Sequence, residues 1–345
     1  MIELTRGNIL TADAEALVNT VNCVGVMGKG IALQFKKAFP ENFKAYEAAC
    51  RNKEVKPGRM FVFNTGQMFN PRFIINFPTK RHWRGKSRYE DIEMGLEALV
   101  QEVRERKIRS IAIPPLGSGL GGLQWEQVKP MIEKAFATMP EVQIKLFEPK
   151  GSPDAKEMPV GTANPKMTVA RALFVKLVQQ YTRFAYRLTL LEIQKLAYFL
   201  QESGLDLKLR YVKHLYGPYA HNLNKVLEIL EGHYIRGYGD TQKPDVEITL
   251  LPDADKEADR FLQLHPNAMP NLERVADLVD GFETPYGMEL LSSVHWIAVH
   301  DREASDAEGA IVAMANWNER KQRLFKADHI HLAWERLQAE DWLKA

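Results

Sequence analysis

The sequence predicts an α/β domain with three layers and a mixed β-sheet, followed by a mostly α-helical second domain. In residues 1–150, short apolar runs alternate with stretches whose apolar positions recur every three to four residues. Such continuous apolar runs are typical of strands buried between two layers of helices. Residues 151–164 are rich in Pro, Gly and small polar residues without an apolar period, which is typical of a linker. From residue 165 to residue 345 the helical period dominates.

The first domain is expected to alternate strands and helices. Strands are predicted at residues 2–5, 16–22, 60–64, 73–77, 110–114 and 142–147, and helices at about 31–39, 41–51, 87–106 and 125–138. Ser87 and Glu90 indicate a capping box at the start of the third helix, because a serine and a glutamate three residues apart can satisfy each other's backbone N–H groups.

The second domain is expected to consist almost entirely of helices. They are predicted at about 167–186, 189–203, 221–231, 255–265, 272–282, 287–300, 308–325 and 328–343, with one short strand at 246–250. Thr189 and Glu192 form a second capping-box pattern, and Gly204 is the stop signal of the same helix.

Composition favours a soluble, cytoplasmic protein of about two domains. The chain has 345 residues, of which 45% are hydrophobic and 26% charged. No apolar run approaches the roughly twenty residues that span a bilayer, and the amino-terminal residues lack the pattern of a signal peptide. Residues 1–164 carry a net charge of +6 and residues 165–345 one of −4, which permits a nucleic-acid substrate on the first domain.

Two glycine-rich loops, at residues 19–32 and 116–125, are the main functional signal. Each lies between a predicted strand and a predicted helix. Glycine permits a positive φ and leaves no Cβ to block a phosphate, and the helix that follows presents its amino end to an anion. A plain strand-to-helix turn is the alternative interpretation of each loop. Neither loop has the spacing of a P-loop or of the dinucleotide fingerprint, which argues against a kinase or a dehydrogenase.

These two loops, together with Gly7-Asn8-Ile9, resemble the macrodomain family, whose fold binds ADP-ribose. The resemblance covers essentially all of residues 1–150. The segment Asn76–Arg84 places Lys80 just after a strand, which is similar to the macrodomains that remove ADP-ribose with a lysine. Within that branch, the chain most resembles antitoxins that strip ADP-ribose from thymidine bases in DNA after a partner toxin has modified them. The resemblance implies no cofactor.

The resemblance implies a role for each matching position. Asn8 and Ile9 would lie near the adenine. Asn22 would hold the distal ribose, with a turn-capping side chain as the alternative. The walls around the diphosphate would come from the two glycine-rich loops. The residues expected to bind the substrate are Asn8, Ile9, Asn22, Val26, Gly28, Lys29, Gly30, Thr79, Ser118, Gly119, Leu120, Gly121 and Gly122.

Lys80 is the predicted catalytic residue. Cleavage between the anomeric carbon of ribose and a base nitrogen is expected to pass through an oxocarbenium-like transition state. The Lys80 ammonium would donate a proton to the departing base or bond an oxygen at the site. Alternatively, burial and the nearby cations Arg81, His82 and Arg84 would lower its pKa so that the free amine attacks the sugar. The lysine-using macrodomain of animals has an acid where this chain has Gly121, and the missing acid favours the non-covalent role.

The segment Lys80–Arg88 is basic and contains one tryptophan, a composition typical of a groove for single-stranded nucleic acid. We predict that Arg81, Trp83 and Arg84 contact DNA. An ordinary charged loop before a helix is the alternative. Because no sequence-reading module is evident, specificity is expected to come from the modified base.

In the second domain, His214–Tyr219, downstream of Ile193–Phe199, resembles a helical antitoxin domain called Panacea. Domains of that type neutralise toxins by binding them. The acidic balance agrees, because a toxin that modifies DNA must present a basic groove. Packing of a helical core is the alternative role of these residues. The histidines of this domain lack an acid or a cysteine to complete a ligand set, so no metal is predicted.

The leading hypothesis is therefore a bifunctional antitoxin. Its first domain would hydrolyse ADP-ribose from thymidine in single-stranded DNA, and its second would bind the cognate ADP-ribosyltransferase toxin, with no membrane partner. Two alternatives stay open. One is a non-catalytic reader of ADP-ribose, and the other is a deacylase of ADP-ribosylated glutamate or O-acetyl-ADP-ribose.

Overall fold

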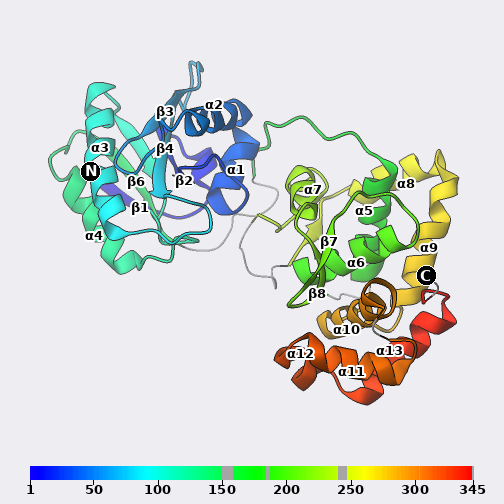
Figure 1. The fold of residues 1–345 in the computed structure, drawn as a ribbon. Coiled ribbons are helices and arrows are strands. Elements are labelled where there is room, and N and C mark those ends of the chain that lie inside the picture. Colours follow the sequence, from blue (N-terminus) through cyan, green and yellow to red (C-terminus); the bar gives the residue numbers. More distant parts are fainter. Residues whose placement is uncertain (150–157, 184–186, 240–246, 303, 344–345) are drawn as a thin grey trace. The chain divides into compact units, whose positions relative to one another are not determined.

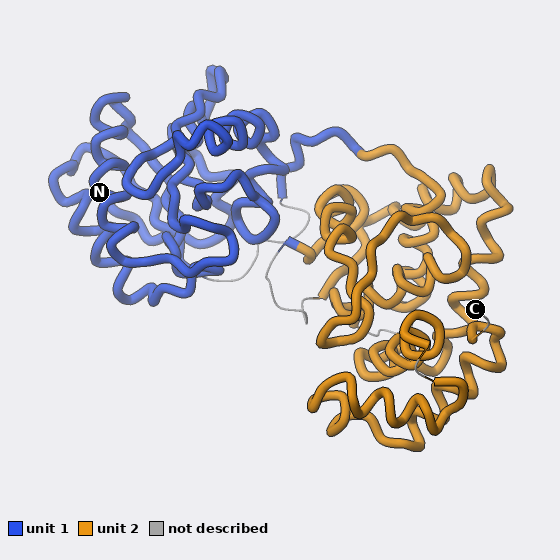
Figure 2. Tube along the Cα trace, in the orientation of Figure 1, with its two compact units in different colours: residues 1–164, 239–242 blue, residues 165–238, 243–345 orange. Residues whose placement is uncertain are grey.

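The computed structural model describes residues 1–149, 158–183, 187–239, 247–302 and 304–343. The chain forms two compact units, Met1–Asn164 with Gly239–Gln242 and Pro165–Tyr238 with Lys243–Ala345 (Figure 2). Among the described helices, none combines the length and the apolar character that crossing a membrane requires.

The segment expected to be a linker, residues 151–164, lies partly outside the described residues. From residue 158 onward it belongs to the first unit. Met158 is buried there, and the N–H of Gly161 donates to the carbonyl of Lys37 over 2.8 Å. The described part of this segment therefore contacts the first unit at Met158 and Gly161.

The first unit is built around a six-stranded mixed sheet with the order β1-β6-β5-β2-β4-β3 (Figure 1). The pairs of neighbouring strands are parallel except for β3 with β4, which is antiparallel. The strands are β1 (Ile2–Thr5), β2 (Ala16–Asn22), β3 (Phe61–Asn64), β4 (Phe73–Lys80), β5 (Ser110–Ile113) and β6 (Gln143–Phe147). This confirms the predicted fold class.

Helices cover both faces of the sheet because the central strands bury alternate side chains on opposite sides. In β2, Ala16 and Val18 join the cluster under α3 and α4, whereas Leu17 joins the one that contains Phe35 of α1. The helices are α1 (Gly30–Ala38), α2 (Pro40–Arg51), α3 (Tyr89–Glu105) and α4 (Trp125–Phe136).

The predicted capping box at the start of α3 is wrong. The helix begins at Tyr89, its N-cap residue is Arg88, and no side chain makes a capping hydrogen bond there. Ser87 instead lies before the helix, where its N–H donates to the carbonyl of Gly121 over 3.0 Å. The second glycine-rich loop, rather than the helix, therefore fixes the position of Ser87.

The sheet topology places the functional segments at one edge. Strands β5, β2 and β4 are neighbours and run parallel, so their carboxyl ends meet on the same side, where open α/β sheets bind ligands. The first glycine-rich loop follows β2, the second follows β5, and Lys80 is the last residue of β4.

The second unit is mostly helical, as predicted. The described helices are α5 (Val169–Thr182), α6 (Leu190–Glu202), α7 (Leu223–Leu230), α8 (Ala254–Gln263), α9 (Met269–Val279), α10 (Pro285–Trp296), α11 (Ala307–Trp317), α12 (Glu319–Leu324) and α13 (Ala327–Ala339). The capping box of Thr189 and Glu192 is confirmed. The helix predicted over 308–325 is interrupted at Asn318, whose side chain caps α12 by accepting from the N–H of Lys321 over 2.9 Å.

A β-hairpin in this unit was not predicted. It consists of β7 (Tyr211–His214) and β8 (Gly217–Ala220). Buried polar side chains hold it from beneath: Lys195 Nζ donates to the carbonyl of Pro218 over 2.6 Å, and Gln194 bonds both the N–H and the carbonyl of Ala220. The short strand expected near residue 250 is present as β10 (Thr249–Leu250), paired with β9 (Ile235–Arg236).

Candidate functional site

Asn22 organises the first glycine-rich loop. Its Oδ1 accepts from the N–H groups of Val24 (3.0 Å) and Val26 (3.3 Å), and its Nδ2 donates to the carbonyl of Val26. The hydroxyl of Tyr46, from α2, donates to the carbonyl of Asn22 over 2.6 Å. The turn-capping role considered for Asn22 is therefore present, and within the described part of the chain its second amide hydrogen has no partner.

The first glycine-rich loop leads directly into the amino end of α1. Met27 anchors it with 1% of its surface exposed. Lys29 is the N-cap of α1 in an extended conformation, and Gly30 opens the helix with a φ of +60°. Only glycine adopts that conformation without strain. Val26, Gly28, Lys29 and Gly30 thus form a continuous backbone wall.

The second glycine-rich loop turns tightly on itself. Gly117 and Gly122 have φ values of +68° and +79°, and the N–H of Leu123 donates to the carbonyl of Gly117 over 3.0 Å. At Gly121 a Cβ would lie 2.2 Å from the Gly117 carbonyl oxygen and 2.3 Å from Ser87 Oγ. No side chain of any kind fits at position 121 in this conformation.

Lys80 joins the two loops. Its Nζ donates to the carbonyl of Leu120 at the tip of the second loop. On the other side, a Cβ on Gly30 would lie 3.2 Å from Leu120 Cδ1, so the two loops are in contact there. Lys80 is half-buried, and this burial lowers the pKa of its amine. The predicted catalytic lysine is therefore placed where both glycine-rich loops meet.

The predicted DNA contacts divide into two groups. Arg81 binds Asp91 of α3, from Nη2 to Oδ1 over 3.0 Å and from Nε to Oδ2 over 3.3 Å. Asp91 is 2% exposed. The Arg81 guanidinium therefore neutralises a buried carboxylate of the fold. Burial, and not a neighbouring cation, accounts for the lowered pKa of Lys80. Trp83 is 38% exposed, with the Arg84 guanidinium 4.6 Å from its ring centroid.

Asn8 and Ile9, which were expected near the adenine, lie just after β1. Asn8 is the N-cap of a 3-10 turn at Ile9–Thr11, and its Oδ1 accepts from the N–H of Leu10 over 3.0 Å. Ile9 is buried in the cluster against which Ile31 of α1 packs. Thr79 is buried, and its hydroxyl faces the carbonyl of Val21 at 3.5 Å. The side-chain oxygen of Asn8, like that of Asn22, therefore makes a structural hydrogen bond with a backbone N–H.

Cys23, in the first loop, is a protonated thiol. Burial raises its pKa to about 11, and a thiol in that state is a poor nucleophile. Its Sγ donates to the carbonyl of Lys80 over 3.4 Å. Within the described residues, no cluster of His, Cys, Asp and Glu side chains is arranged to hold a metal ion.

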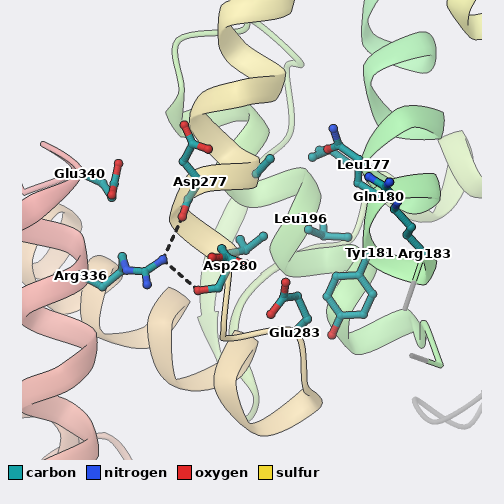
Figure 3. Close-up of a pocket in the computed structure, with 12 residues that line it drawn as sticks. Leu177, Gln180, Tyr181, Arg183, Leu196, Asp277, Asp280, Glu283, Arg336 and Glu340 are labelled. Atoms are coloured by element: carbon teal, nitrogen blue, oxygen red, sulfur yellow. Dashed lines mark hydrogen bonds between the residues drawn. The ribbon is translucent and has the colours of Figure 1, made fainter. Parts of the chain in front are cut away.

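The helical unit contains a hollow of its own. It has a volume of about 550 Å³ and is lined by residues of α5, α6, α9 and α13 (Figure 3). Arg336 lies at one side of the hollow, where its guanidinium donates to the carbonyls of Asp277 (2.9 Å) and Asp280 (2.8 Å). These two hydrogen bonds cap the carboxyl end of α9. Asp277, Asp280, Glu283 and Glu340 give its lining an acidic character.

The fold and the paired glycine loops define the first unit as a macrodomain, and the macro domain family model matches residues 18–132. The DNA ADP-ribosyl glycohydrolase of Thermus aquaticus is 49% identical over 337 residues, which cover 98% of this chain and 93% of that protein. We conclude that the chain belongs to the DNA ADP-ribosyl glycohydrolase family, known as DarG, and is a hydrolase of that family.

Two further comparisons are informative. The macrodomain of Mycobacterium tuberculosis DarG is 55% identical, covers 44% of this chain and 99% of that chain, and has a TM-score of 0.43. A fusion protein of Thermosipho africanus, named as DNA ADP-ribosyl transferase and DNA ADP-ribosyl glycohydrolase, is 31% identical over 175 residues, which cover 46% of this chain and 45% of that protein.

Sequence reasoning missed three residues at this site. Tyr46 fixes Asn22, Asp91 binds Arg81, and Ser87 supports the second loop. Asp91 was detectable in principle, because it places a carboxylate on the apolar face of α3, in one row with Gly95 and Leu99. The other two act through tertiary contacts that no local pattern encodes.

Proposed function

We propose that the first unit hydrolyses the N-glycosidic bond between ADP-ribose and thymidine in DNA. The observation that carries the proposal is the position of Lys80 Nζ, half-buried at the junction of two phosphate-type loops. Membership of a family named for DNA ADP-ribosyl glycohydrolase activity supports the same substrate class.

The proposed binding mode follows the loops. Asn8 and Ile9 face the adenine, and Asn22 offers its remaining amide hydrogen to the distal ribose. Backbone N–H groups of both loops surround the diphosphate, where the amino end of α1 favours negative charge. The residues in this role are Val26, Gly28, Lys29, Gly30, Ser118, Gly119, Leu120, Gly121 and Gly122, and Thr79 of β4 is proposed as a further substrate contact.

In the proposed reaction, the bond from the anomeric carbon to the base nitrogen breaks with its electron pair moving to the base. The Lys80 ammonium donates a proton to the departing base. Water adds to the oxocarbenium-like carbon, and the proton that this water loses returns to the Lys80 amine. A lowered pKa makes the ammonium a stronger acid, so burial assists this role. The ammonium has three N–H groups, so it can donate to the base while another N–H stays on the Leu120 carbonyl.

A covalent lysine route is disfavoured by the second loop. That route uses an acid in this loop, and the chain has Gly121 at the corresponding position. The close approach of the Gly117 carbonyl and Ser87 Oγ excludes even a methyl group there. Lys80 is therefore proposed to act without forming an adduct.

DNA is proposed to cross the segment after Lys80. Trp83 is partly exposed, stacks on His82 with ring centroids 5.5 Å apart, and carries Arg84 on its ring. An exposed ring flanked by cations is suited to stack on an unpaired base next to a phosphate. Arg81 is proposed to help DNA binding only by holding this segment in place, because its guanidinium is bound to Asp91.

The second unit is proposed to sequester a cognate DarT-like ADP-ribosyltransferase toxin. The fusion of a transferase and a glycohydrolase in one Thermosipho africanus protein supports this partnership. The excess of acidic residues in residues 165–345 suits a partner with a basic groove for DNA. Both the modified DNA and such a toxin belong to the cytoplasm, where we propose that the protein acts.

The decisive assay measures release of ADP-ribose from an oligonucleotide with one ADP-ribosylated thymidine. Lys80→Ala should abolish release, and Lys134→Ala, at an exposed lysine of α4, should leave it unchanged. Equal rates for wild type and Lys80→Ala would reject the lysine mechanism. Faster release from ADP-ribosylated glutamate or O-acetyl-ADP-ribose than from DNA would instead assign a deacylase.

The full-length Lys80→Ala variant also tests the second unit. Because it retains the whole chain but lacks the catalytic lysine, any inhibition of the toxin by this variant must come from binding. Sequestration predicts that it inhibits the purified ADP-ribosyltransferase at stoichiometric amounts. Absence of both binding and inhibition would remove the sequestering role while leaving the hydrolase intact.

A further inference from the structure

Ser87 carries an unused hydroxyl beneath the second glycine-rich loop. The residue is 7% exposed, and its Oγ has no hydrogen-bond partner among the residues that the structure describes. A buried polar group without a partner destabilises the folded state, so native structures rarely keep one without a reason. Its own backbone N–H is bonded to Gly121, which holds the hydroxyl at the base of the loop.

The ordinary explanation for a serine at this position does not apply. A serine before a helix usually caps it, but α3 starts two residues later, behind Arg88, and takes no side-chain cap. The hydroxyl also excludes side chains from the loop, because a Cβ would lie 2.3 Å from it at Gly121 and 3.2 Å from it at Gly117. Ser87 therefore faces the glycines of the loop.

The loop above Ser87 is in a closed arrangement. The Leu120 carbonyl accepts from Lys80, and the Leu120 side chain lies against Gly30 of the first loop. A diphosphate seated between the two loops would take the space in which Leu120 makes both contacts. Its binding would then move the backbone of residues 117–122.

We propose that Ser87 is a positioning residue for the substrate-bound form of this loop. In the closed loop its hydroxyl lacks a partner, and in the open loop it bonds a backbone group of residues 117–122. Ligand binding then relieves the penalty of the buried hydroxyl, and that relief adds to affinity. This inference rests on the proposed ADP-ribose site and adds a residue that does not itself touch the reacting atoms.

Ser87→Ala tests the inference through the Tm without ligand and the Kd for ADP-ribose. A purely structural role of Ser87 would lower the Tm, whereas the proposed role weakens binding and leaves the Tm unchanged or higher. Without ligand, thermal unfolding of the full chain should occur at an unchanged or higher Tm, because no hydrogen bond is lost. Calorimetric titration with free ADP-ribose should show a Kd about tenfold weaker, which is about 1.4 kcal/mol. In the DNA assay, KM should rise while kcat stays near that of wild type.

Ser110→Ala is the matched control. Ser110 begins β5, at the opposite end of the strand from the loop, and its Oγ accepts from the N–H of Glu15 over 2.9 Å. Its loss should lower the Tm and leave the Kd for ADP-ribose unchanged.

A lower Tm with an unchanged Kd for Ser87→Ala would overturn the inference, as would no change in either quantity. If wild type itself fails to bind ADP-ribose, the proposed function fails instead. The two failures are therefore distinguishable.

Discussion

The tight packing at Gly121 predicts that Gly121→Ala opens the second glycine-rich loop at a cost to stability. An added Cβ would lie 2.2 Å from the Gly117 carbonyl oxygen, 2.3 Å from Ser87 Oγ and 2.9 Å from the Gly117 carbonyl carbon. Two of these atoms belong to the backbone, so no side-chain rotation relieves the overlap. The loop itself must move.

The size of the effect follows from the overlap. Ordinary contacts of a Cβ begin at 3.4 Å, so the Gly117 carbonyl must retreat by more than 1 Å. Overpacking of this kind costs about 1–3 kcal/mol. For a unit of this size, 1 kcal/mol corresponds to roughly 2–4 °C in Tm, and the first unit should therefore unfold on the order of 5 °C earlier.

The assay is thermal unfolding of the full chain, with the transition of the first unit identified by its rise in Tm when ADP-ribose is added. Gly119→Ala is the stability control, since a Cβ at Gly119 meets no atom within 4 Å. It should unfold within about 1 °C of wild type. If Gly121→Ala does the same, the packing argument is refuted, and with it the exclusion of an acid from position 121.

The remaining predictions concern charge. If Lys80 acts as an acid, kcat/KM of the wild type should fall as pH rises, with an apparent pKa below the ordinary 10.5 of lysine; a rate that increases with pH would indicate attack by the free amine. Arg81→Ala should lower the Tm, because it leaves the buried Asp91 carboxylate without its guanidinium, whereas Arg84→Ala should keep the Tm and weaken binding of single-stranded DNA in low salt, as measured by fluorescence anisotropy. In the second unit, burial lowers the pKa of Lys321 to about 8. The unfolded chain therefore binds more protons between about pH 8 and 10.5, and the free energy of unfolding should rise with pH across that window; Lys321→Met should flatten this slope.

The sheet and its helices were predictable because each strand is a short apolar run between turn signals. The end of β4 was not. The strand was expected to stop at Phe77, before Pro78, since proline lacks an N–H for the ladder. It continues to Lys80 because β3 pairs with β4 only as far as Asn76, so beyond that residue no strand on that side requires the missing N–H.

The hairpin of the second unit was missed for a related reason. Each of its strands has four residues, and β8 contains Pro218 directly after Gly217 with a φ of +89°. Local propensity argues against a strand there. The hairpin forms because Lys195 and Gln194 of α6 bond its backbone from the buried side, and such tertiary contacts leave no periodic signal in the sequence.

The charges around Lys80 explain why a macrodomain with this loop favours proton donation over covalent catalysis. A lysine becomes a nucleophile when burial and an adjacent cation together drive off its proton. Here the adjacent guanidinium, Arg81, is neutralised by Asp91, and only partial burial perturbs the amine. The second glycine-rich loop supplies the Leu120 carbonyl, which accepts a hydrogen bond from Lys80 and so favours the ammonium. The same loop has Gly121 at the position where the covalent route uses an acid. The neutralised Arg81 and the Leu120 carbonyl favour the ammonium, whereas partial burial opposes it and makes it a stronger acid. The site therefore supports Lys80 as a proton donor.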